Sequence, residues 1–78
     1  SQGEAMLNLR YGLISALLGD EVTAERALTL ALDIAADAGL PWIEVRAHIE
    51  LGRAFLDRGA KSLAGAHLSS AREILALD

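Results

Sequence analysis

Cysteine is absent from this 78-residue chain, and proline, tryptophan, tyrosine and phenylalanine each occur once. The lack of cysteine excludes disulfides, thiolate zinc sites and cysteine nucleophiles. Valine occurs twice and isoleucine five times, so strand-forming residues are scarce and an all-β fold is disfavoured. The apolar runs are far shorter than the roughly 20 residues that span a bilayer. Lysine and arginine form no cluster of the kind that binds a phosphate backbone.

Alanine and leucine, with 15 residues each, supply most of the apolar content. Both favour helices, and the length suits one small domain, so the composition predicts an all-α fold. The net charge is −4, which disfavours direct binding to nucleic acid. The first residues do not resemble a signal peptide, so we expect a cytoplasmic protein that does not enter a membrane. Six arginines against one lysine favour a bacterial source.

Glycines divide the chain into four predicted helices. Gly19, Gly39 and Gly59 each follow a helical stretch, at the position where a left-handed backbone is common. The predicted helices cover residues 4–18, 21–38, 41–58 and about 62–77. They form two hairpins, 4–39 and 40–78, within one domain.

Capping residues set the predicted helix starts. Asp20 is the expected N-cap of the second helix and Ser62 that of the fourth, because both side chains can accept a backbone amide proton. Pro41 suits the first turn of the third helix, where its missing N–H has no cost. Residues 1–3 are predicted to be disordered or a vector-derived remnant.

An offset of 40 residues aligns the second half of the chain with the first. A glycine inside a helix costs about 1 kcal/mol relative to alanine. Its recurrence at Gly12 and Gly52 therefore predicts that two helices cross closely in each half. The identical pairs are Gly12/Gly52, Gly19/Gly59, Ala24/Ala64, Leu28/Leu68, Ala31/Ala71, Ile34/Ile74 and Ala36/Ala76. We interpret the chain as two antiparallel helical hairpins stacked in register.

The second half also contains a known motif, in which an aromatic residue, Leu-Gly, a second aromatic, alanine and a bulky apolar residue follow at set spacings. Its residues are His48, Leu51-Gly52, Phe55, Ala64 and Leu68; the first half has Asn8, Tyr11-Gly12, Ser15, Ala24 and Leu28. Over residues 5–78 the chain therefore resembles the tetratricopeptide repeat family. Its spacing of 40, against the usual 34, is similar to the longer repeats of kinesin light chain and of maltose-activator-type bacterial transcriptional regulators.

This resemblance implies a fragment of a right-handed α-solenoid that holds protein partners and catalyses nothing. The residues that carry the repeat pattern are expected to be structural. They are Gly12, Gly19, Ala24, Leu28, Ala31, Gly52, Phe55, Gly59, Ala64, Leu68 and Ala71.

A partner-binding groove is expected on the inner surface of such a fragment. The third helix carries Arg46, Glu50, Arg53 and Asp57 in one row of alternating charge. One interpretation is a solvated ladder of charges, and the other is that the two arginines hold carboxylates of a peptide. The groove predicted from this row and the first helix consists of Met6, Leu9, Leu13, Leu17, Arg46, Ile49, Arg53, Leu56 and Asp57.

The first helix is apolar on nearly all sides, so one neighbour cannot cover it. We expect a preceding repeat, a second copy or a bound segment to cover the remainder; the competing interpretation is that the third helix folds over it. The function predicted is a protein-interaction module of a larger bacterial regulatory or scaffolding protein, which binds an amphipathic helix or extended peptide. Alternatives are self-assembly through the first helix and a small-molecule sensor between the hairpins.

No pattern in the sequence predicts catalysis, a cofactor or a metal. The serines lack a G-x-S-x-G turn, and the glycines do not form a phosphate-binding loop. His48 is expected to be a packed imidazole, and His67 to lack a converging set of metal ligands. Trp42 is expected to pack into the joint between the hairpins, and the alternative is an anchor for a partner.

Overall fold

Four α-helices contain most of residues 1–77, the part of the chain that the computed structural model describes. The helices are α1 (Gln2–Leu17), α2 (Glu21–Ala38), α3 (Pro41–Asp57) and α4 (Lys61–Ala76), and this part of the chain contains no strand. The prediction of an all-α fold with four helices is confirmed. Asp78, the last residue of the second predicted hairpin, lies outside the described residues.

Each of the three connections between helices contains a glycine just after the preceding helix, as predicted. Gly19, Gly39 and Gly59 have φ angles of 83°, 68° and 77°. These values lie in the left-handed region, where a side chain would be strained and glycine is not. In each turn the amide of the following residue donates to a carbonyl five residues earlier, at 2.9 Å. The same turn geometry therefore recurs at all three connections.

Asp20 caps α2, as the sequence predicts. Its Oδ1 accepts a hydrogen bond from the backbone amide of Thr23 at 3.1 Å. Hydrogen bonding to Thr23 favours the ionised carboxylate and lowers the pKa of Asp20 below its usual value. Pro41 occupies the first turn of α3, also as predicted.

Helix α1 begins at Gln2, so residues 1–3 are not the disordered segment of one interpretation; the other interpretation, a vector-derived remnant, stays a prediction. The hydroxyl of Ser1 accepts the amide proton of Glu4 at 3.3 Å, and the Glu4 carboxylate accepts from Ser1 in return. This reciprocal arrangement is a capping box, which satisfies amide groups that a helix start otherwise leaves free.

The predicted cap of α4 is also wrong. The N-cap is Ala60 instead of Ser62, and no side chain caps this helix. The chain returns to a helical conformation directly after the turn at Gly59, so Ser62 already lies within the first turn of α4.

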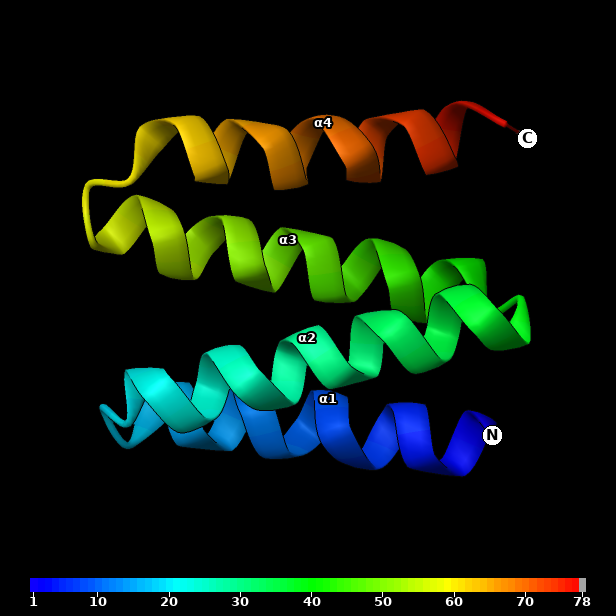
Figure 1. Cartoon of the computed structure of the whole chain (residues 1–78), viewed down its shortest axis with the longest axis horizontal. Helices are drawn as coiled ribbons and strands as arrows, with labels where there is room; N and C mark the ends of the chain where they lie inside the picture. Colours follow the sequence, from blue (N-terminus) through cyan, green and yellow to red (C-terminus); the bar gives the residue numbers. More distant parts are fainter. Residues whose placement is uncertain (78) are drawn as a thin grey trace.

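The helices pack in chain order. Helix α2 lies between α1 and α3, with a smaller contact between α1 and α3, and α4 packs on α3. Within residues 1–77, α4 contacts no other helix, whereas the first and last helices of a closed four-helix bundle would meet. Figure 1 shows the resulting layer, in which the start of α1 and the end of α4 lie at the same end. The molecule measures 32 × 26 × 14 Å.

Gly12 in α1 and Gly52 in α3 allow the same close crossing in both hairpins. A Cβ placed on Gly12 would lie 2.7 Å from Cγ of Leu28, and one on Gly52 would lie 3.0 Å from Cγ of Leu68. In both hairpins a backbone oxygen of the facing helix closes the site, at 3.2 Å and 3.4 Å. These contacts confirm that each pair of helices crosses closely at its glycine. The offset of 40 therefore holds for contacts as well as for residue identities.

The core extends across the joint between the hairpins. Its largest fully buried side chains are Leu28 on α2 and Ile43 and Leu51 on α3. Helix α1 contributes less, and Leu7, Leu17 and the following residue, Leu18, are largely exposed. The prediction that the first helix is not fully covered is confirmed, and the competing idea that the third helix covers these residues is wrong.

Candidate functional site

A hollow of about 390 Å³ lies where α1 and α3 face one another over α2. Its apolar floor comes from α1 and α2, because these helices turn leucines and a small alanine toward α3. Its rim is a row of charged residues on α3, spaced so that they share one side of that helix. The lining residues are Leu13, Ala16, Leu17, Leu28, Arg46, Glu50, Arg53, Ala54 and Asp57.

Much of the predicted groove meets in this hollow. The structure brings together Leu13 and Leu17 of α1 with Arg46, Arg53 and Asp57 of α3. These residues lie far apart in the sequence, and the packing of α3 beside α1 places them on one surface.

Other members of the predicted groove lie elsewhere. The inclusion of Leu9 is wrong, because this side chain is buried in the core cluster and has no free surface for a partner. Met6 packs against the same cluster, Ile49 is half-buried, and Leu56 is exposed; none of the three lines the hollow. The periodicity of a helix predicts on which side of the helix a residue lies, but it does not predict how deeply the side chain is buried.

Sequence reasoning missed three residues that close the hollow: Ala16, Leu28 and Ala54. Leu28 belongs to the repeat pattern, but the spacing alone does not predict that it also lines a hollow shared with α3. Glu50 was recognised as part of the charged row, although it was not assigned to the groove.

Glu50 joins the two arginines of the rim. Its Oε2 accepts a hydrogen bond from Arg46 Nε at 3.0 Å and lies 3.6 Å from Arg53 Nη1. The Glu50 side chain is 11% exposed, whereas those of Arg46 and Arg53 are 52% and 71% exposed. A shielded carboxylate thus holds one nitrogen of each guanidinium group, and both groups keep other N–H donors for solvent or a partner.

A second polar cluster, missed by sequence reasoning, joins α3 to α4. The Nδ1 atoms of His48 and His67 lie 3.0 Å apart, and the ring of His67 stacks on Phe55 with centroids 5.5 Å apart. The Arg58 guanidinium lies 4.7 Å from the centre of the Phe55 ring. His48 is a packed imidazole, as predicted, and helical spacing did not predict its contact with His67.

Burial lowers the pKa of His48, and the positive charge of a protonated His67 lowers it further, against an opposing effect of Glu44. Two ring nitrogens at hydrogen-bonding distance need one donor and one acceptor. The pair is therefore compatible with one bridging proton. No group of three or more histidine, aspartate or glutamate residues that could hold a metal ion occurs in residues 1–77.

Trp42 does not pack into the joint between the hairpins. Its side chain is 55% exposed and lines a small apolar hollow between α3 and α4, together with Pro41, Val45, Ile74 and Leu75. The expected packing is wrong because Ile43, the next residue, is the one turned into the joint and fully buried.

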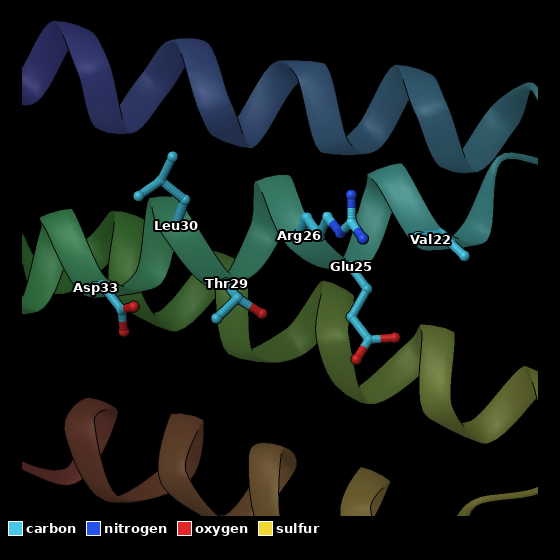
Figure 2. A pocket seen from close by; sticks show the side chains of 6 residues that line it. All are labelled: Val22, Glu25, Arg26, Thr29, Leu30 and Asp33. Atoms are coloured by element: carbon cyan, nitrogen blue, oxygen red, sulfur yellow. The ribbon is translucent and has the colours of Figure 1, made fainter.

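A third, shallow hollow of about 420 Å³ lies along α2. Figure 2 shows that its lining side chains, Val22, Glu25, Arg26, Thr29, Leu30 and Asp33, all arise from this one helix. Leu30 points to the side of α1, whereas Glu25 and Asp33 extend the other way. A depression formed by one helix gives a ligand no opposing wall, so the hollow between α1 and α3 is the stronger candidate.

No protein-family model, curated protein or solved structure matches this chain. Within residues 1–77, no helix combines the length and the apolar character needed to cross a membrane.

Proposed function

We propose that this chain is a non-catalytic interaction module made of two tetratricopeptide-like hairpins, a fragment of a right-handed α-solenoid, within a larger cytoplasmic regulatory or scaffolding protein of bacterial origin. The observation that carries the proposal is the hollow between α1 and α3, which combines an apolar floor with a charged rim. The matching contacts at Gly12 and Gly52 support the repeat architecture.

The floor suits apolar side chains of a partner. Leu17 is exposed and Leu13 is partly buried, and both lie on the same side of α1 because they are four residues apart. Leucines at this spacing match the apolar face of an amphipathic helix, on which residues three and four apart lie together. Such a partner removes apolar area from water on both sides.

The rim sets the orientation of the partner. Arg46 and Arg53 have donors left for a carboxylate, while Asp57 lies at the end of the row near the α3 terminus and offers an acceptor. A partner helix with an acidic residue beside the arginines and a basic residue beside Asp57 complements this row. We infer that the occupant is an amphipathic segment with this order of charges.

A peptide titration tests the proposal. The probe is a helical peptide with two leucines four residues apart, glutamate at one end and lysine at the other; the control is the same peptide with the two charges exchanged. Amide chemical shifts of the isotope-labelled protein are expected to change at Leu13, Leu17 and Arg53. The exchanged peptide is expected to bind about tenfold more weakly, a difference of about 1.4 kcal/mol.

Two substitutions in the groove test whether the peptide binds there. Leu17→Ala and Arg53→Gln are expected to weaken binding while helicity stays unchanged, because both side chains are exposed. Leu63→Ala on α4 is the matched control, since this leucine is also exposed and does not line the hollow. Equal affinity of the wild type and the two groove variants for the probe would reject this site.

A further inference from the structure

Helix α1 presents a narrow apolar stripe that is separate from the groove. Leu7, Tyr11, Ile14 and Leu18 are all more than half exposed. Their spacings of four, three and four residues place them on one line along the helix. The groove residues Leu13 and Leu17 lie on another part of the circumference. The stripe resembles a helix-packing seam from which the opposing helix is absent.

The repeat shows what covers the equivalent stripe on α3. Forty residues later, the positions are Ala47, Leu51, Ala54 and Arg58. Ala47 and Leu51 are fully buried, and Arg58 pairs with Glu25 of α2. In the second hairpin this stripe therefore packs against the preceding hairpin. The first hairpin has apolar residues at the equivalent positions, and within residues 1–77 their side chains stay more than half exposed.

At the other end of the molecule, α4 exposes leucines whose counterparts on α2 are buried. Leu28 on α2 is 1% exposed because α1 and α3 lie over it, whereas its counterpart Leu68 on α4 is 38% exposed. Ala35 is fully buried on α2, and its counterpart Leu75 is 60% exposed. Leu68 and Leu75 lie at the edge of the contact between α4 and α3, and within residues 1–77 no helix other than α3 contacts α4. The positions with which α2 covers α3 are therefore left partly exposed on α4.

The exposed faces of α1 and α4 differ from their counterparts at the contact between α2 and α3, and a change on one face is matched by a change on the other. Inside the chain, Arg58 Nη1 and Glu25 Oε2 form an ion pair at 3.0 Å across the joint. The counterparts of these two residues are Leu18 and Gly65. Both charges are therefore lost together, and a Cβ on Gly65 would meet nothing within 4 Å, which leaves room above it for a leucine.

A second correlated change concerns side-chain size. Where α2 ends and α3 begins, one small and one large residue are fully buried in the same cluster: Ala35 on α2 and Ile43 on α3. Their counterparts are Leu75 and Gly3, so the large and small residues exchange sides. A volume exchanged across an interface keeps the total nearly constant, which packed interfaces tolerate best.

We propose that two copies of this chain associate head to tail, with α4 of one copy lying on α1 of the next as α2 lies on α3 within the chain. The stripe Leu7–Tyr11–Ile14–Leu18 then packs against Leu68 and Leu75 of the neighbour. Because the two faces are different, this contact is heterologous and does not close after one step. Successive copies continue the helical array, and the groove between α1 and α3 belongs to a different surface. The proposal does not depend on the proposed function.

Sedimentation velocity from about 5 µM to about 500 µM covers the affinities expected of such a joint. The weight-average mass of the wild type is expected to rise with concentration beyond that of a dimer. Ile14→Glu and Leu75→Glu each place a charge on one of the two faces and are expected to stay monomeric. Both replaced side chains are more than half exposed, so the monomer fold is retained. Leu63→Glu, an equally exposed site outside both faces, is the control that still associates.

The equimolar mixture of Ile14→Glu and Leu75→Glu distinguishes head-to-tail from symmetric pairing. The first variant keeps its α4 face and the second keeps its α1 face, so the mixture is expected to form a one-to-one dimer and nothing larger. If Leu75→Glu alone dimerises, α1 pairs with α1 and the proposal is wrong. A wild type that stays monomeric throughout also overturns it. Both results leave the peptide titration of the groove unaffected, because the two surfaces do not share residues.

Discussion

The two hairpins share one contact pattern, yet the same residue type is buried to different depths in each. Leu28 and Leu68 both pack on a helix-interior glycine, but Leu28 is covered again by the next hairpin and Leu68 is not. The comparison shows that burial in this chain follows from the position of a hairpin in the array. A helix in the middle of a stack is enclosed on two sides, and one at the end is enclosed on one.

The largest difference is expected when each leucine is truncated. Leu28→Ala leaves a cavity in the enclosed core and should cost about 2–5 kcal/mol, comparable to the whole stability of a domain of this size. Leu68→Ala removes a partly solvated side chain and should cost about 1 kcal/mol. Urea unfolding followed by circular dichroism, at low concentration so that the proposed association is absent, measures both. Equal costs would mean that the two hairpins are enclosed to the same degree.

A smaller difference is expected when a methyl group is added to each glycine. Gly12→Ala forces a Cβ against Leu28, which cannot move away, so overpacking of about 1–3 kcal/mol exceeds the gain in helix propensity of about 1 kcal/mol. Gly52→Ala meets Leu68, which can rotate toward solvent, so the two effects should nearly cancel. Thermal unfolding of the two variants shows which one is the less stable. A more destabilised Gly52→Ala would contradict this account of the comparison.

The smallest effect is expected from pH between about 5.5 and 7.5, and in this interval only the second hairpin should produce it. Because the pKa of His48 is lower in the folded chain than its usual 6.5, the unfolded chain binds the proton first as pH falls. Stability is therefore full above about pH 6.5 and declines below it, toward the folded pKa. The melting temperature should be lower at about pH 5.5 than at about pH 7.5. His67 and Glu44 are the titratable groups that act on His48.

The matched control uses the first hairpin. Asn8 occupies the position equivalent to His48, so His48→Asn gives the second hairpin the side chain of the first. This variant is expected to lose most of the pH dependence in that interval. An unchanged pH dependence would show that the histidine pair is not its source.

Much of the fold could be predicted because its signals are local. Glycines that need a positive φ, a proline in a first turn and an aspartate cap each act within a few residues. The errors were local too. Ser62 had the right chemistry for a cap but the wrong place, because the turn at Gly59 lets the helix begin at once. At the N-terminus, Ser1 and Glu4 form a capping box whose two parts were not considered together.

The candidate site could be predicted only in part. The row of charges on α3 and the leucines of α1 were identified from helical periodicity, and they do meet in one hollow. Leu9 shows the limit of this reasoning, because periodicity placed it in the predicted groove whereas packing buries it in the core. The histidine pair shows another limit, since its members are brought together across two helices.

The amino-acid sequence by itself determined four helices, their glycine turns and the close crossing at Gly12 and Gly52, because these depend on backbone freedom and on neighbours along the chain. The tertiary structure alone decided which copy of each repeated residue is enclosed. Burial depends on which helices lie over a residue, and two identical leucines 40 residues apart carry no local sign of that difference.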